Sequence, residues 1–156
     1  MENTTEEKDY MGMALAEAEA AARAGEVPVG AVIVGPTGDV LARARNQMRA
    51  ANDPTAHAEI AAIRAACIAL GNQRLTGCDL YVTLEPCPMC AGAIAEARLA
   101  RLYYGAADLK GGAVDNGVAL FAQASCHHSP EIYGGLRESD CAGLLKDFFA
   151  LRRNVT

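Results

Sequence analysis

The sequence predicts an α/β fold of three layers, in which helices cover both faces of a mixed five-stranded sheet. Two observations lead to this prediction. First, a nearly continuous β-branched run over 27–34 is followed by turn residues and a second short run, which predicts a buried strand and its hairpin partner. Second, helical and strand-like segments alternate through the middle of the chain, and the opening hairpin makes the sheet mixed.

The first helix is expected over 5–23, where an apolar stripe follows helical spacing and Gly25 comes next as a terminator. The stripe consists of Met11, Leu15, Ala18 and Ala22. The strand over 27–34 leads into the turn Pro36–Thr37–Gly38, and 39–44 is the predicted hairpin partner.

A polar stretch over 46–55 separates the hairpin from the alternating segments. These are expected as a helix over 56–70 ending at Gly71, a strand over 79–84, a helix over 88–98, a strand over 101–105, a glycine-rich loop over 108–117, a short strand at 132–133 and a helix over 139–153. The last helix should bury an apolar face made of Cys141, Leu144, Leu145, Phe148 and Leu151. In such folds, sites form where strands end and helices begin.

Composition indicates one domain over 1–156, with no linker and no apolar run near the roughly 18 residues needed to span a membrane. The acidic N-terminus is unlike a secretory signal, so we expect a cytoplasmic protein in a reducing compartment. The isolated cysteines, Cys67, Cys78, Cys126 and Cys141, are then expected to be free thiols. The net charge of −5 argues against sequence-blind nucleic-acid binding. A local basic patch would still form if the fold gathers Arg98, Arg101, Lys110, Arg152 and Arg153.

A Cys-x-x-Cys motif stands where the predicted strand 79–84 gives way to a helix. Pro88 suits the first helical position, which makes Cys87 the N-cap and Cys90 the third helical residue. The positive end of the helix favours thiolates, the form that binds zinc. Taken alone, the pair is equally open to redox chemistry or simple burial.

His57 is the natural third ligand, because it stands at the predicted start of another helix. Three protein ligands leave one position for water, which is the catalytic arrangement of zinc. Glu59 follows two residues later, about 200° around a regular helix, so both side chains reach one site only if His57 belongs to an irregular first turn. His127 and His128 lack this spacing and are expected to be structural or exposed.

Together the two motifs match the His-x-Glu…Pro-Cys-x-x-Cys signature of zinc nucleobase deaminases. The predicted reaction is hydrolytic deamination, with zinc-activated hydroxide as the nucleophile. Glu59 would carry a proton from water to a ring nitrogen and later to the leaving amine.

Segments along nearly the whole chain resemble the cytidine deaminase-like superfamily and, within it, the bacterial tRNA-specific adenosine deaminases. The resemblance is carried by 27–32, Asn46, 53–59, 80–94, 104–106, 108–113 and 147–153. It implies a homodimer that converts adenosine to inosine at the wobble position of an arginine tRNA with an ACG anticodon. It further implies that the base is flipped from the anticodon stem-loop into the zinc pocket.

The same resemblance implies roles for residues outside the metal site. Asn46 and the backbone at Ala58 would contact the flipped base, and Val29 would wall its pocket. Asp108 and Lys110 would meet the neighbouring ribose and phosphate. Contacts from the last helix to RNA would come from Phe149, Arg152 and Arg153.

Other interpretations of these residues remain open on sequence alone. Asn46 is equally suited to a turn, Asp108 and Lys110 to a solvated loop, and Arg152 and Arg153 to the negative end of a helix dipole. Two alternative functions also remain, namely a deaminase of free guanine or cytosine and a non-catalytic deaminase-like subunit that binds tRNA.

Overall fold

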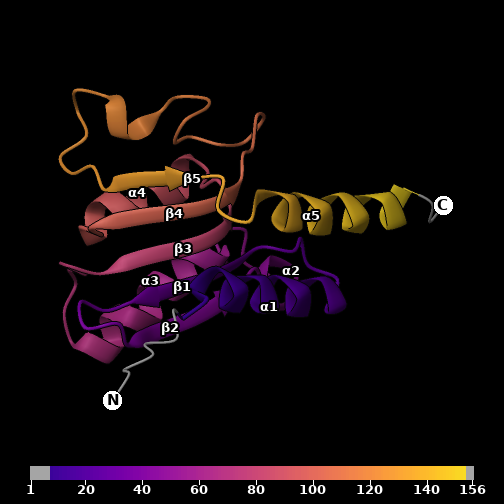
Figure 1. The fold of residues 1–156 in the computed structure, drawn as a ribbon, viewed down its shortest axis with the longest axis horizontal. Coiled ribbons are helices and arrows are strands. Elements are labelled where there is room, and N and C mark those ends of the chain that lie inside the picture. Colours follow the sequence, from indigo (N-terminus) through magenta and orange to yellow (C-terminus); the bar gives the residue numbers. More distant parts are fainter. Residues whose placement is uncertain (1–7, 154–156) are drawn as a thin grey trace, which may run out of the picture.

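The computed structural model describes residues 8–153 of the 156-residue chain (Figure 1). The strands are β1 (Gly30–Val34), β2 (Val40–Arg45), β3 (Asp79–Leu84), β4 (Arg101–Ala106) and β5 (Glu131–Gly134). The helices are α1 (Tyr10–Arg23), α2 (Met48–Ala51), α3 (Ala58–Leu70), α4 (Pro88–Ala97), the short 3₁₀ turn η1 (Leu120–Ala122) and α5 (Glu138–Arg153).

The five strands form one mixed sheet in the order β2-β1-β3-β4-β5. β1 pairs antiparallel with both β2 and β3, whereas β3–β4 and β4–β5 are parallel. The hairpin therefore opens the sheet, and crossovers through helices or long loops build the rest, as the sequence predicts. All of β1 is buried, which agrees with its nearly continuous apolar composition.

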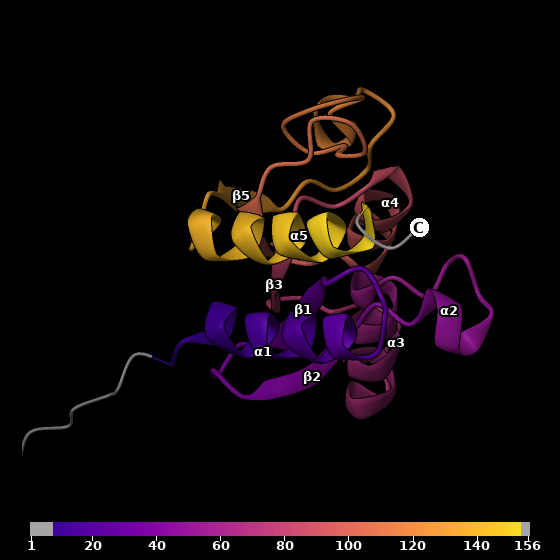
Figure 2. The same cartoon turned by 90° about the vertical axis from the view of Figure 1, so that its right-hand side faces the viewer.

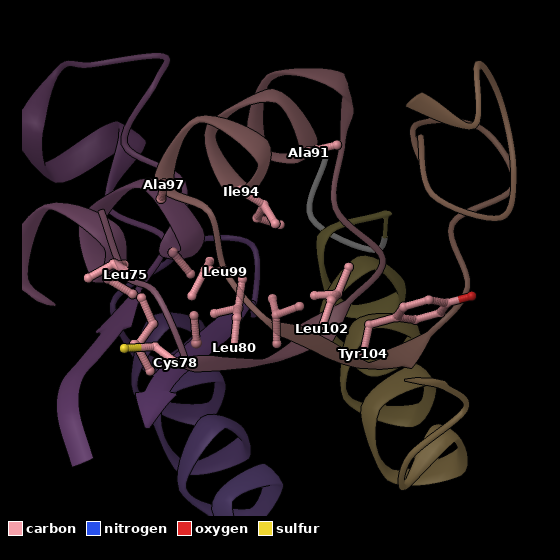
Figure 3. Packing of buried hydrophobic residues seen from close by; sticks show 14 of the residues in the cluster. Leu75, Cys78, Leu80, Ala91, Ile94, Ala97, Leu99, Leu102 and Tyr104 are labelled. Atoms are coloured by element: carbon pink, nitrogen blue, oxygen red, sulfur yellow. The ribbon is translucent and has the colours of Figure 1, made fainter. Parts of the chain in front are cut away.

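Helices cover both faces of the sheet. α1 and α5 lie together on one face, and α3 and α4 pack on the other (Figure 2). Alternate residues of each strand enter the two resulting cores. On the α3–α4 side, Leu80 and Leu102 from neighbouring strands meet Ile94 of α4 (Figure 3). The predicted three-layer α/β fold is confirmed.

Several element boundaries differ from the prediction. α1 begins at Tyr10 because the Asp9 side chain caps the helix by accepting a hydrogen bond from the Gly12 N–H at 2.8 Å. The predicted start at 5–7 lies outside the described residues. The end of α1 is as expected: Gly25 has a φ of 81°, and the N–H groups of Gly25 and Glu26 bond back to Ala22 and Ala21.

Two short elements were not predicted: α2 lies in the polar stretch 46–55, and η1 lies between loop 108–117 and β5, where no element was expected. They have too few residues for a hydrophobic period to show. Leu151 is also a correction, because it is 71% exposed near the end of α5 rather than part of its buried face. α5 runs past the ends of the strands there, so its last turn has no strand beneath it (Figure 1). Within 8–153, none of the helices is both long and apolar enough to cross a membrane.

Candidate metal centre and active site

The Cys-x-x-Cys motif occupies the junction predicted for it. β3 ends at Leu84, and Cys87 is the N-cap of α4 in an extended conformation (φ −74°, ψ 173°). Pro88 is the first helical residue, so Cys90 is the third. Both sulfurs thus lie at the positive end of the α4 dipole.

His57 is the N-cap of α3, also in an extended conformation (φ −72°, ψ 153°). The regular helix starts only at Ala58, which makes Glu59 the second helical residue. The geometric requirement stated from the sequence is therefore met: the backbone at His57 is not helical, and the 200° separation of a regular helix does not apply.

The two helix starts bring three donor atoms together. His57 Nδ1 lies 3.6 Å from Cys87 Sγ and 3.5 Å from Cys90 Sγ. All three donors lie within 4.8 Å of one another. One imidazole nitrogen and two sulfurs suit Zn²⁺, and a three-donor set leaves one coordination position for a reactant. The residues present therefore fit a catalytic zinc ion.

The surroundings shift the pKa values of the two thiols in opposite directions. A hydrogen bond from the Cys90 thiol, backbone N–H groups at the start of α4 and the nearby His57 lower the pKa of Cys87 to about 5. The hydrogen bond to Cys87 and burial raise the pKa of Cys90. The pair therefore readily gives up a first proton, and a cation between the sulfurs would favour loss of the second.

Glu59 is buried beside these donors, with 4% of its surface exposed. Burial is the largest influence and raises the pKa of its carboxyl to about 7. A carboxyl group that holds and releases a proton near neutral pH is suited to proton transfer.

Asn46, Val29 and Ala58 lie together on the His57 side of the centre. Asn46 Oδ1 accepts a hydrogen bond from the Ala58 N–H at 2.8 Å, and Asn46 Nδ2 donates one to the Val27 carbonyl at 3.1 Å. The Asn46 N–H bonds to the Val29 carbonyl at 3.1 Å. Asn46 thus caps the start of α3, a role that the sequence did not predict, and the two bonds use its Oδ1 and one of its two Nδ2 hydrogens.

Asp108 and Lys110 occupy the loop after β4. The Asp108 carboxylate accepts hydrogen bonds from the N–H groups of Lys110 and Gly111 at 3.2 and 2.9 Å, which shapes a tight turn. The Lys110 side chain is exposed. The loop is held to the segment that immediately precedes Cys87, since the Ala113 N–H bonds to the Pro86 carbonyl at 2.9 Å.

Two buried carboxylates were missed from the sequence, and one of them, Glu85, stands two residues before Cys87. Glu85 is 2% exposed and accepts hydrogen bonds from the 108–116 segment. Glu26 is also 2% exposed and accepts the N–H groups of Arg49 and Ala50 at 3.0 and 2.9 Å. Their partners lie more than 20 residues away in sequence, so no local signal could have identified them. Only the position of Glu85 beside the Cys-x-x-Cys motif was a hint.

The residues of α5 are set apart from the metal centre. Phe149 is 44% exposed and packs edge-on against the buried Phe148. The Arg152 guanidinium lies 4.1 Å from the centre of the Phe148 ring and donates to the Gly25 carbonyl at 3.0 Å. Arg152 therefore ties α5 to the end of α1. Arg153 is the last residue of α5, and its side chain is outside the described part.

The remaining cysteines and histidines follow the simpler interpretation. Cys78 and Cys141 are buried, Cys67 and Cys126 are half-buried against the core, and all are free thiols. His128 Nε2 lies 2.6 Å from the Leu99 carbonyl, a structural contact, and His127 is exposed.

Comparison with known proteins agrees with this geometry. Residues 4–106 match the cytidine and deoxycytidylate deaminase zinc-binding region. A tRNA-specific adenosine deaminase of Agrobacterium fabrum is 57% identical over 148 residues, which cover 95% of this chain and 97% of that protein. A solved structure from studies of A-to-I editing by tRNA:A34 deaminases is 60% identical, with a TM-score of 0.85 over 87% of this chain and 98% of its own. A guanine deaminase structure from Bacillus subtilis is 32% identical, with a TM-score of 0.60 over 100% of this chain and 97% of its own.

Proposed function

The chain belongs to the tRNA-specific adenosine deaminases, a zinc-binding family, and from this premise we propose that it hydrolyses adenosine in tRNA to inosine and ammonia. One observation carries the proposal: a His-Cys-Cys donor set converges beside a buried carboxyl group. His57, Cys87 and Cys90 would hold the Zn²⁺, and Glu59 would move the protons.

Zinc supplies a Lewis acid that makes water nucleophilic near neutral pH. Glu59 would accept a proton from the attacking water and deliver it to the adenine ring as oxygen adds to C6. The same carboxylate would then take the proton of the hydroxyl added at C6 and pass it to the amino group. The C6–N bond breaks, ammonia leaves and C6 keeps the oxygen as the carbonyl of inosine. The burial of Glu59 and its pKa near 7 suit both transfers.

The similarities favour RNA over a free base as substrate. Identity reaches 57% with a tRNA-specific adenosine deaminase but 32% with a guanine deaminase that shares the fold. We further propose the finer assignments implied by the resemblance: the wobble adenosine of an arginine tRNA with an ACG anticodon, a homodimer and a cytoplasmic location. One deaminase domain over 1–156 would carry the activity.

Substrate contacts complete the proposal. Asn46, Val29 and Ala58 would surround the flipped base, since they cluster at the start of α3 beside His57. Asp108 and Lys110 would meet the backbone near the target base. Phe149, Arg152 and Arg153 would contact RNA further away, where α5 projects beyond the sheet (Figure 1). Burial of Glu59 beside the three donors speaks against a non-catalytic subunit.

The test compares RNA with free bases. The zinc-loaded protein is incubated with an ACG anticodon stem-loop and, separately, with guanine, cytosine and adenine. We expect inosine at the wobble position of the RNA and no ammonia from the free bases. Ammonia from a free base with unchanged RNA would replace this proposal by the free-base alternative, and no reaction with any substrate would favour the non-catalytic one.

A further inference from the structure

Loop 108–117 lies next to the metal centre but contributes none of its three donors. The segment is irregular, with turns and bends between β4 and η1. Loops of this kind are normally mobile unless their backbone groups find partners. The structure supplies such a partner in one buried side chain, Glu85.

The Glu85 carboxylate accepts hydrogen bonds from four backbone N–H groups and one side chain of the loop. Oε1 accepts from the Asp108 N–H at 3.0 Å and from Asn116 Nδ2 at 2.7 Å. Oε2 accepts from three consecutive N–H groups, those of Val114, Asp115 and Asn116, at 3.1, 3.0 and 3.0 Å. The buried charge is thus fully surrounded by donors, which is the condition for burying a carboxylate at low cost.

The loop is shaped to approach this carboxylate closely. A Cβ atom at Gly112 would lie 2.6 Å from Glu85 Cδ, 2.7 Å from Glu85 Oε2 and 2.5 Å from the Asp108 carbonyl. Gly117, with a φ of 58°, closes the turn, and a Cβ there would lie 2.3 Å from the Gly112 carbonyl. The absence of a side chain at Gly112 thus lets the loop backbone approach the carboxylate, and Gly117 lets the chain turn back onto Gly112.

Glu85 also stands at a fixed point of the scaffold. Its N–H bonds to the Ala106 carbonyl at the end of β4 at 2.8 Å, and Cys87 follows two residues later. A displacement of the loop relative to Glu85 is therefore a displacement relative to the metal ligands. Because Glu85 is buried under the loop, it acts through the loop and not by touching substrate.

From these contacts we propose that Glu85 is a positioning residue that orders loop 108–117 and so places Asp108 and Lys110 for substrate binding. The inference rests on the proposed function for its substrate. It predicts that loss of the carboxylate raises KM for RNA more than it lowers kcat, because Glu59 and the three donors stay in place.

The test uses the full-length, zinc-loaded protein with Glu85→Gln, which keeps the shape but replaces one acceptor oxygen by an NH₂ group. We expect hydrogen exchange at the amides of Asp108 and 114–116 to accelerate at least about tenfold, with unchanged zinc content. KM for the anticodon stem-loop should rise about tenfold, and kcat should change by less than about twofold.

Gly112→Ala provides an independent perturbation, because it keeps the carboxylate and separates the loop from it. We expect the same split between KM and kcat. Gly143→Ala is the matched control, since its Cβ meets nothing within 4 Å, and exposed Glu19→Gln controls for loss of charge. Asn116→Ala, which removes a single hydrogen bond, is the milder variant if Glu85→Gln does not fold.

The outcomes separate the two proposals. Unchanged amide exchange in Glu85→Gln, or faster exchange with unchanged KM, would overturn the positioning role. Loss of zinc and of kcat at constant KM would overturn it as well, because Glu85 would then support the metal ligands. A wild-type protein that deaminates no RNA would refute the proposed function, whereas amide exchange would still decide whether Glu85 holds the loop.

Discussion

His57 and Glu59 can serve one centre only because the backbone at His57 is extended. With ψ at 153°, His57 belongs to the segment that enters α3, and Glu59 belongs to the first turn of the helix. The side chains are then free of the helical rotation that would direct them apart. One N-cap conformation thus joins a potential metal ligand to a potential proton carrier.

Glu59→Gln tests the proton-transfer role at this position. The amide has nearly the same shape but neither accepts a proton from water nor returns one to the amine. We expect kcat on the anticodon stem-loop to fall at least about 10²-fold, with zinc content close to one ion per subunit. Single-turnover kinetics and metal analysis on the same preparation measure both quantities.

Glu96→Gln is the matched control for this variant, because Glu96 is an exposed residue of α4. It should retain wild-type kcat and zinc content. Near-normal turnover by zinc-loaded Glu59→Gln would refute the assignment. Loss of zinc in that variant would instead indicate that Glu59 helps to bind the metal ion.

Individual residues were predictable where a local rule applied. Pro88 defines the start of α4, and with it the placement of Cys87 and Cys90. The resemblance singled out Asn46 as a site residue. Its hydrogen bond from the Ala58 N–H could not be predicted, because that bond depends on how the hairpin meets α3. Glu26 and Glu85 could not be assigned, because their partners come from distant loops.

At the scale of elements, α1 packs closely on β1 at Gly30. A Cβ atom at Gly30 would lie 1.9 Å from the Ala14 carbonyl and 2.7 Å from the Ala18 N–H group. Gly30→Ala should therefore lower the free energy of unfolding by about 1–3 kcal/mol, as expected for overpacking against a backbone. Urea denaturation followed by circular dichroism measures it.

Gly143→Ala again provides the comparison, because the new methyl group has open space on α5. It should change stability little or increase it slightly, since alanine favours helix. Equal effects of the two substitutions would mean that α1 does not approach β1 as closely as described.

The short helix α2 depends on Glu26. Burial alone would raise the pKa of this carboxyl, but hydrogen bonds from the Ala50 and Arg49 N–H groups outweigh burial and lower it below its ordinary 4.5. Because its pKa is lower in the folded than in the unfolded protein, the Glu26 carboxylate stabilises the fold above about pH 4.5. This stabilisation is lost as the pH falls through the pKa that Glu26 has in the folded protein.

Glu26→Gln should therefore lower the free energy of unfolding by about 1–3 kcal/mol at pH 7. The difference from the wild type should shrink toward zero as the pH is lowered below 4.5. Denaturation curves of both proteins over this range give the comparison. A difference that stays constant with pH would assign the effect to packing instead of to the charged carboxylate.

The long elements and the short strand β5 were predictable, whereas α2 and η1 were not. The bounds of β3 match the expected 79–84, because an apolar strand between turn residues is a strong local pattern. α2 and η1 have four and three residues, and contacts from elsewhere in the chain hold them, such as those from Glu26. The exposure of Leu151 also escaped prediction, since helical periodicity does not show where the sheet beneath a helix ends.

At the scale of the whole molecule, the chain carries a net charge of −5, yet its proposed substrate is a polyanion. Binding must then depend on a few cations placed near the site, against general repulsion. The exposed Lys110 is one candidate, because its loop is tied to the segment just before Cys87. Arg74, exposed and just before β3, lies at the opposite end of that strand from Cys87.

Lys110→Gln should weaken binding of the anticodon stem-loop and also reduce its salt dependence. Each phosphate contact to single-stranded RNA contributes a slope of about −0.7 to the plot of log affinity against log salt, so losing one should flatten it by about that amount. Fluorescence anisotropy between 50 and 300 mM salt, with zinc-loaded Glu59→Gln as a non-reacting background, measures the slope. Arg74→Gln in the same background should leave it unchanged. Equal slopes with and without Lys110 would mean that this lysine faces no phosphate, and the proposed path of the RNA along loop 108–117 would have to be abandoned.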